Sequence, residues 1–117
     1  MTDTKQLSGK TTIAPDVLVA IARLTTLSVE GVSKLAALPV DVGPLFRKPQ
    51  HEGVRIEVIG NEVNVDLYVI VRRDCNVRDV SRAIQIQVAR AISETVGMDV
   101  GKINIHVEDI DYSEPAA

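Results

Sequence analysis

The sequence is poor in cysteine and in aromatic residues: it has one Cys, one Phe, two Tyr and no Trp in 117 residues. Because a disulfide needs two thiols, Cys75 supports no disulfide framework, and a reducing compartment is expected. No apolar run approaches the ~20 residues of a membrane-spanning helix, and the first residues, MTDTKQLSGK, lack the apolar segment of a signal peptide. We therefore expect a cytoplasmic protein that does not insert into a membrane and reaches one only through a partner.

Positive charge does not predominate either. The chain has 13 Lys and Arg against 16 Asp and Glu, a net charge of -3. Proteins that bind the nucleic-acid backbone gain affinity by neutralising phosphates with clustered Lys and Arg. Nucleic acid is therefore not the expected partner. The composition, 45% hydrophobic and 25% charged, is that of an ordinary globular protein. The length suits one domain.

A β-hairpin is the most clearly encoded element. Between residues 54 and 71 apolar and polar residues alternate with the two-residue period of strands buried on one face. Gly60 and Asn61 interrupt this pattern and suit a two-residue turn, which needs positive backbone angles. The register that follows from this turn pairs Val58 with Val63, Ile56 with Val65, Val54 with Leu67, Glu57 with Asn64 and Arg55 with Asp66. One apolar face then remains to be covered.

Two amphipathic helices are predicted to cover that face. The first has Pro15 in its first turn and runs from Asp16 to about Val29. Its three- and four-residue spacing predicts a buried stripe of Val17, Ala20, Ile21, Leu24 and Leu27. The second runs from Val77 to Val96, with Asn76 as N-cap and Gly97 as stop signal. Its predicted buried stripe is Val77, Val80, Ile84, Val88, Ala91, Ile92 and Thr95.

The remaining segments complete a two-layer fold. Residues 10–13 suit a short optional strand, residues 32–38 a helical turn or two, and residues 102–108 a last strand. A helix joins the hairpin to that strand, so the second hairpin strand and the last strand should be parallel. We predict an α+β two-layer α/β sandwich, with two helices on one face of a three- to four-stranded mixed sheet in (β)αββαβ order. Residues 9–110 form the domain, flanked by flexible ends at 1–8 and 111–117.

No motif predicts catalysis, a cofactor or a metal. Cys75 has no CxxC companion, and the two histidines, His51 and His106, lack metal-ligand spacing. The acidic residues near the C-terminus, Glu108, Asp109, Asp111 and Glu114, follow a strand and its tail rather than a calcium loop. An RNA-binding sheet stacks bases on two or three aromatic rings, and the uncovered face of this sheet offers Tyr68 alone.

Apolar residues at positions expected to be exposed point instead to protein contacts. Val19 and Ile86 fall opposite the predicted stripes of their helices, and Phe46 lies in a Pro-rich connection between residues 39 and 53. Such residues favour a protein partner or self-association. The candidate contact residues are Val19, Arg23, Leu45, Phe46, Arg82, Ile86 and Arg90. We expect Ile86→Asp or Phe46→Asp to weaken association without unfolding the domain.

Three segments resemble the alkaline shock protein family of bacterial envelope-stress-response proteins. They read GKTTIAPDVLVAIARLTTLSVEGV from Gly9 to Val32, GVRIEVIGNEVNVDLYVIV from Gly53 to Val71, and VSRAIQIQVARAISETVGMDVGKINIHVEDI from Val80 to Ile110. The family often has Tyr-Gly where this chain has Arg73-Asp74. The resemblance implies a small non-enzymatic cytoplasmic protein without cofactors. It also implies that the protein associates with itself or its relatives, and some members are held at the membrane by a separate anchor protein.

The hypothesis is therefore a protein-interaction module of the envelope stress response. The alternative is a single-stranded RNA-binding module on a KH-like or ferredoxin-like sheet. A third hypothesis, an enzyme of ferredoxin-like form, would depend on Cys75.

Overall fold

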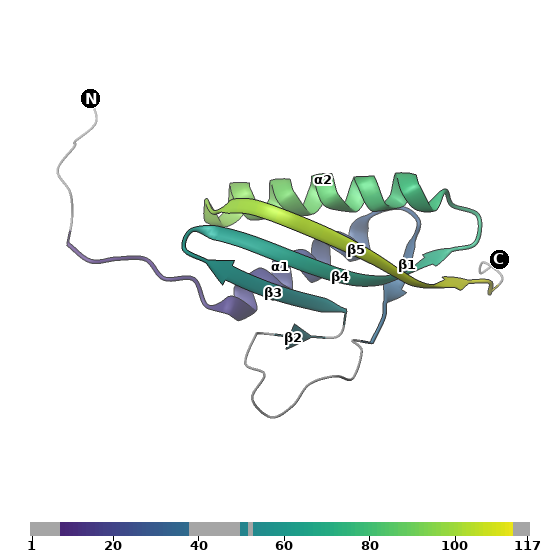
Figure 1. Cartoon of the computed structure of the whole chain (residues 1–117), viewed down its shortest axis with the longest axis horizontal. Coiled ribbons are helices and arrows are strands. Elements are labelled where there is room, and N and C mark those ends of the chain that lie inside the picture. Colours follow the sequence, from purple (N-terminus) through teal and green to yellow (C-terminus); the bar gives the residue numbers. More distant parts are fainter. Residues whose placement is uncertain (1–7, 38–49, 52, 114–117) are drawn as a thin grey trace.

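The computed structural model describes residues 8–37, 50–51 and 53–113. They form two layers, with two helices over one face of a mixed sheet (Figure 1). In chain order the elements are α1 (Pro15–Ser28), β1 (Val32–Leu35), β2 (Gln50–His51), β3 (Val54–Ile59), β4 (Glu62–Arg72), α2 (Val77–Val96) and β5 (Asp99–Asp111). The predicted two-layer α+β sandwich is confirmed, and the described sheet has five strands because β1 and the two-residue β2 join it.

The hairpin of β3 and β4 has the predicted register at all five predicted pairs. Gly60 has a φ of 62°, whereas no non-glycine residue of the described chain has a positive φ. A glycine with positive φ at the first central position is typical of a type II′ turn. Val54, Ile56 and Val65 are fully buried under the helices. Val58 shares their face but is 43% exposed, so the helices stop short of the hairpin end.

β4 is the central strand of the sheet. Its whole length pairs with β5, which is parallel to it as predicted. Its other edge is shared, because β3 pairs with residues 62–67 and β1 pairs with residues 69–71. The predicted helical turns at residues 32–38 are therefore wrong at residues 32–35: β3 is too short to cover all of β4, and β1 supplies the missing hydrogen bonds. The optional strand at residues 10–13 does not form.

Gly53 allows β1 and β3 to meet beside β4. The Tyr68 N–H donates to the Gly53 carbonyl at 2.9 Å, and the Ala36 N–H donates to the Tyr68 carbonyl at 2.7 Å. Gly53 has a φ of +76°, and a Cβ added there would lie 2.6 Å from the Leu35 Cβ. Both the backbone angle and the close approach therefore favour glycine.

α2 has the predicted bounds and caps. The Asn76 Oδ1 accepts a hydrogen bond from the Asp79 N–H at 3.0 Å, and Gly97 ends the helix in the left-handed region with a φ of 72°. The centre of its predicted stripe is buried, namely Val80, Ile84, Val88 and Ile92. Thr95, which was also predicted in the stripe, is exposed because it lies beyond the last buried turn.

α1 also has the predicted bounds, but the opposite face is buried. Leu18, Val19, Ala22 and Thr26 face the core, at 1%, 2%, 0% and 0% exposure. Four residues of the predicted buried stripe lie in solvent instead: Ala20 is exposed, and Val17 is 43% exposed, Leu24 61% and Leu27 39%. The prediction was wrong because α1 has apolar residues on both sides, so the spacing alone does not decide which side packs against the sheet.

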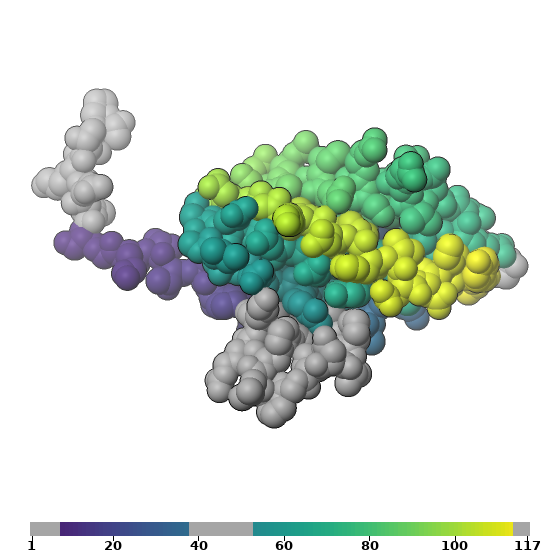
Figure 2. Space-filling view, in the orientation of Figure 1, coloured from purple at the N-terminus to yellow at the C-terminus, as the bar shows by residue number. Residues whose placement is uncertain are grey.

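The last strand, β5, is longer than residues 102–108 and runs along the outside of the sheet beside α2 (Figures 1 and 2). In the described part of the chain it pairs only with β4. β5 is therefore an edge strand.

Candidate interaction surfaces

The solvent side of α1 is an apolar surface, which we call the α1 outer face. Its members are Val17, Ala20, Ile21, Leu24 and Leu27. All are exposed except Ile21, which is half-buried. At about 100° per residue, Val17 and Leu24 lie ~20° apart around the helix axis, on the side opposite the buried Ala22 and Thr26. A helix that is apolar on both sides is typical of one that packs against something on each of them.

Two charged residues flank this surface on one side. Asp16 and Arg23 are seven residues apart, so they lie ~20° apart around the helix. Both are exposed. Arg23 is exposed as predicted, but the apolar surface beside it is the stripe that was predicted to be buried, and Val19 is not on a surface at all. The exposure predicted for Val19 is wrong, because this residue belongs to the buried side of α1.

α2 offers a smaller apolar spot. Ile86 is 51% exposed, and Arg82 and Arg90, four residues before and after it, are exposed as well. This arrangement agrees with the prediction that these three residues form one accessible surface. Leu45 and Phe46, the two loop candidates, lie outside the described residues.

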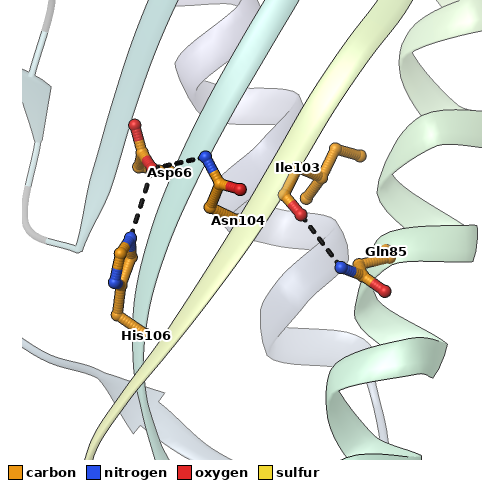
Figure 3. A network of polar contacts seen from close by, with 5 residues as sticks. All are labelled: Asp66, Gln85, Ile103, Asn104 and His106. Carbon is orange, nitrogen blue, oxygen red and sulfur yellow. Dashed lines mark hydrogen bonds and ion pairs between the residues drawn. The ribbon is translucent and has the colours of Figure 1, made fainter.

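The uncovered face of the sheet carries a polar network (Figure 3). The Asp66 Oδ1 accepts a hydrogen bond from the Asn104 Nδ2 at 3.0 Å, and the same oxygen lies 3.2 Å from the His106 Nε2. These side chains come from neighbouring positions of β4 and β5, where Asp66 pairs with Asn104 and Tyr68 with His106. His106, predicted as a plain surface residue, is thus half-buried and bonded to a carboxylate.

Tyr68 is packed between its neighbours on this face. Its ring is stacked on the ring of His106, with 4.4 Å between centroids and 11° between planes. The Arg55 guanidinium carbon, on the opposite neighbouring strand, lies 5.8 Å from the Tyr68 centroid. Tyr68 is only 7% exposed. Because a base can stack only on an accessible ring, this geometry does not favour the RNA-binding alternative.

Asp111 connects the end of β5 to β1. Its Oδ2 accepts a hydrogen bond from the Ser33 hydroxyl at 2.5 Å, and its Oδ1 accepts from the hydroxyl and the N–H of Ser113 at 2.6 and 2.9 Å. The Ser113 hydroxyl, followed by that of Ser33, lowers the pKa of Asp111 well below its ordinary value. The Ser33 hydrogen bond therefore links the end of β5 to β1.

The described residues contain no group of three or more His, Cys, Asp or Glu side chains arranged to hold a metal ion. Cys75 is a half-buried free thiol. No helix in the described ranges has both the length and the apolar content to span a membrane. Sequence reasoning missed the α1 outer face as an exposed surface, although its signal was present: α1 has a second apolar stripe that the sheet cannot cover at the same time.

A family model matches residues 3–112, nearly the whole chain. The chain belongs to the alkaline shock protein 23 family, which has a cell envelope-related function. The resemblance noted from sequence segments is thereby confirmed. Nothing in this match indicates a catalytic family.

Two relatives come from Bacillus subtilis (strain 168). The uncharacterized protein YqhY is 26% identical over 110 residues, which cover 92% of this chain and 82% of YqhY. The uncharacterized protein YloU is 22% identical over 111 residues, which cover 92% of each chain.

Solved structures of the MamM CTD are similar in fold. The zinc form of a variant superimposes with a TM-score of 0.58 at 12% identity, covering 83% of this chain and 87% of that one. The copper form gives a TM-score of 0.51 at 12% identity, covering 86% and 91%. At these identities the similarity extends to the fold alone.

Proposed function

We propose that this protein is a non-enzymatic interaction module of a cell envelope-related system, which acts in the cytoplasm by associating with itself and with a membrane-anchored partner protein. The family's envelope-related function supports the setting. One observation supports the self-association: the helix that covers the sheet is apolar on its solvent side as well, with Leu24 61% exposed at its centre. Exposed apolar surface of this continuity is typical of protein–protein contacts.

The charges beside the α1 outer face favour a second copy of the chain. In a two-fold symmetric contact the same surface of both molecules is used. When the two-fold axis is perpendicular to the helices, the two copies of α1 lie antiparallel. Flanking residues on one side of the helix then face the same side of its copy, so Asp16 of each molecule lies against Arg23 of the other. Ala20, near the middle, is small enough to let the two helices approach closely. Val17 of one copy then meets Leu24 of the other.

The size of α1 sets the strength of this association. Its 14 residues span ~21 Å. A contact between two such helices buries less than the ~800 Å² per partner of a standard stable interface, so the dimer should be weak and depend on concentration.

The test is the mass of the purified protein by light scattering over a hundredfold range of concentration. Leu24→Asp should weaken dimerisation at least about tenfold, since burial of most of a leucine side chain contributes ~1–2 kcal/mol and a buried Asp adds a desolvation cost. Ile86→Asp is the comparison variant, because it puts the same charge at an exposed apolar position of α2, where the sequence also predicts a contact. We expect it to weaken association less than Leu24→Asp, since the apolar spot around Ile86 is smaller than the α1 outer face.

The proposal is wrong if Leu24→Asp leaves the association unchanged while Ile86→Asp abolishes it. In that case α2, and not α1, would carry the contact. A protein that stays monomeric at the highest concentration would refute self-association on any surface.

A further inference from the structure

β5 has an open edge. Its inner side pairs with β4, and no described strand pairs with its outer side. One backbone carbonyl of β5 accepts a hydrogen bond from a side chain: the Gln85 Nε2 of α2 donates to the Ile103 oxygen at 3.0 Å (Figure 3). An open edge with free backbone groups is a template for an added strand.

β5 and α2 lie side by side along the molecule (Figure 2), and we call the two hollows between them the groove. It consists of a hollow of about 630 Å³ near the start of α2 and a second of about 270 Å³ further along. On the helix side its wall includes residues four apart in sequence: Val77, Ser81, Gln85 and Ala89. On the strand side it is lined by Val100, Ile103, Ile105 and Val107.

The floor of the groove is apolar surface that α2 leaves uncovered. Residues of β4 on the helix side of the sheet, such as Val65 and Val69, are fully buried. In contrast, the four β5 residues that line the groove are all only half-buried. An extended segment laid along β5 would cover them with every second side chain.

The regular part of β5 is short. Between Val100 and Ile103, and again between Val107 and Asp109, β5 has one residue more than the matching stretch of β4. These bulges leave Ile103 to Val107 as the uninterrupted stretch, five residues or ~17 Å. A short peptide fits this window, whereas the whole β5 strand of a second copy would meet two bulges.

The charge of the groove selects the chemistry of that peptide. Of the residues that line the two hollows, Arg78 alone is charged, and none is a carboxylate. A carboxylate of the peptide near Arg78 would therefore be attracted by that guanidinium without facing an acidic wall.

We infer that the groove between α2 and β5 binds an extended acidic peptide segment of a partner protein, which adds as a strand to the outer edge of β5. Its apolar side chains enter the groove at alternate positions, and an Asp or Glu side chain contacts Arg78. The peptide N–H replaces the Gln85 amide as the donor to the Ile103 carbonyl. This site lies on other elements than the α1 outer face and does not depend on self-association.

The experiment selects a random heptapeptide library against the full chain and against two variants. Arg78→Glu reverses the charge in the groove, and Arg90→Glu is the matched control, an exposed arginine of the same helix that does not line it. We expect enriched peptides that alternate apolar and polar residues and contain Asp or Glu. Binding should fall about tenfold or more in Arg78→Glu, because a charge-assisted hydrogen bond is lost, and should change less than twofold in Arg90→Glu.

The location is checked with one enriched peptide and the amide NMR spectrum of the protein. Shifts and slowed hydrogen exchange are expected at Ile103 to Val107, and Leu24→Asp should leave the affinity unchanged. The inference is overturned if no peptide is enriched, if both arginine variants lose binding equally, or if the shifts fall on other elements. Concentration-dependent protection of the same amides without peptide would overturn it too, because a second copy would then occupy the edge.

Discussion

The reversed faces of α1 can be tested by truncating one residue on each side of the helix. Val19 is 2% exposed and Leu24 is 61% exposed. Val19→Ala removes two buried methyl groups, at ~0.8 kcal/mol each for transfer from water, and leaves a cavity whose cost is added. We expect Val19→Ala to lower the free energy of unfolding by about 2 kcal/mol.

Leu24→Ala should cost much less. Only the buried two-fifths of the side chain is lost, from a full burial of ~1.5–3 kcal/mol, which gives at most about 1 kcal/mol. Alanine has a helix propensity at least as favourable as leucine, so the helix itself is not weakened.

The assay is urea denaturation of both variants at low micromolar concentration, where dimerisation adds little stability. If Leu24→Ala costs as much as Val19→Ala or more, the assignment of the two faces is wrong. Repeating the measurement at higher concentration separates folding from association, because a dimer adds stability by mass action and Leu24→Ala should reduce that added part.

Two further predictions concern polar groups. The Thr26 hydroxyl is buried without a hydrogen-bond partner in the described chain, so Thr26→Val, which has nearly the same shape, should raise the free energy of unfolding by about 1 kcal/mol in the same urea assay; a loss of stability would show that the hydroxyl is bonded. The pKa of Asp111 is lower in the folded state than its ordinary value, so its ionised form stabilises the fold. This stabilisation is fully present at a pH above the ordinary pKa of ~3.9 and is lost as the pH falls through the lower pKa of the folded state. In an NMR titration of the carboxyl group, Ser113→Ala should raise the pKa of Asp111 more than Ser33→Ala does, and an unchanged value in both variants would contradict the hydrogen-bond explanation.

The hairpin and α2 could be predicted because their signals are local. Gly60 fixes the turn, and the two-residue alternation then leaves one register in which every apolar residue faces the core. Asn76 and Gly97 mark the two ends of α2, and its polar side is clearly different from its apolar side. No information from elsewhere in the chain is needed for either element.

The packed face of α1 and the strand β1 could not be predicted in the same way. Leu18 and Val19 on one side of α1, and Val17 and Leu24 on the other, are equally apolar, so the choice is made by packing against β1, β3 and α2. Thr26 on the buried side even favours the wrong face. The sequence gives only a weak indication of β1. The second hairpin strand is longer than the first, so the first strand cannot pair with its whole edge and another strand is needed beside the rest.

The edge of β5 explains why self-association is assigned to α1 and not to the sheet. Each bulge of β5 brings in an exposed charged residue, Lys102 at the first and Glu108 at the second. Charges and bulges at an edge oppose the pairing of two long strands, which is how natural sheets avoid joining edge to edge. The α1 outer face has no such interruption, and its flanking charges, Asp16 and Arg23, are opposite in sign and match when the helix meets its own copy. The same edge remains open to a short peptide, because the five residues between the bulges are regular.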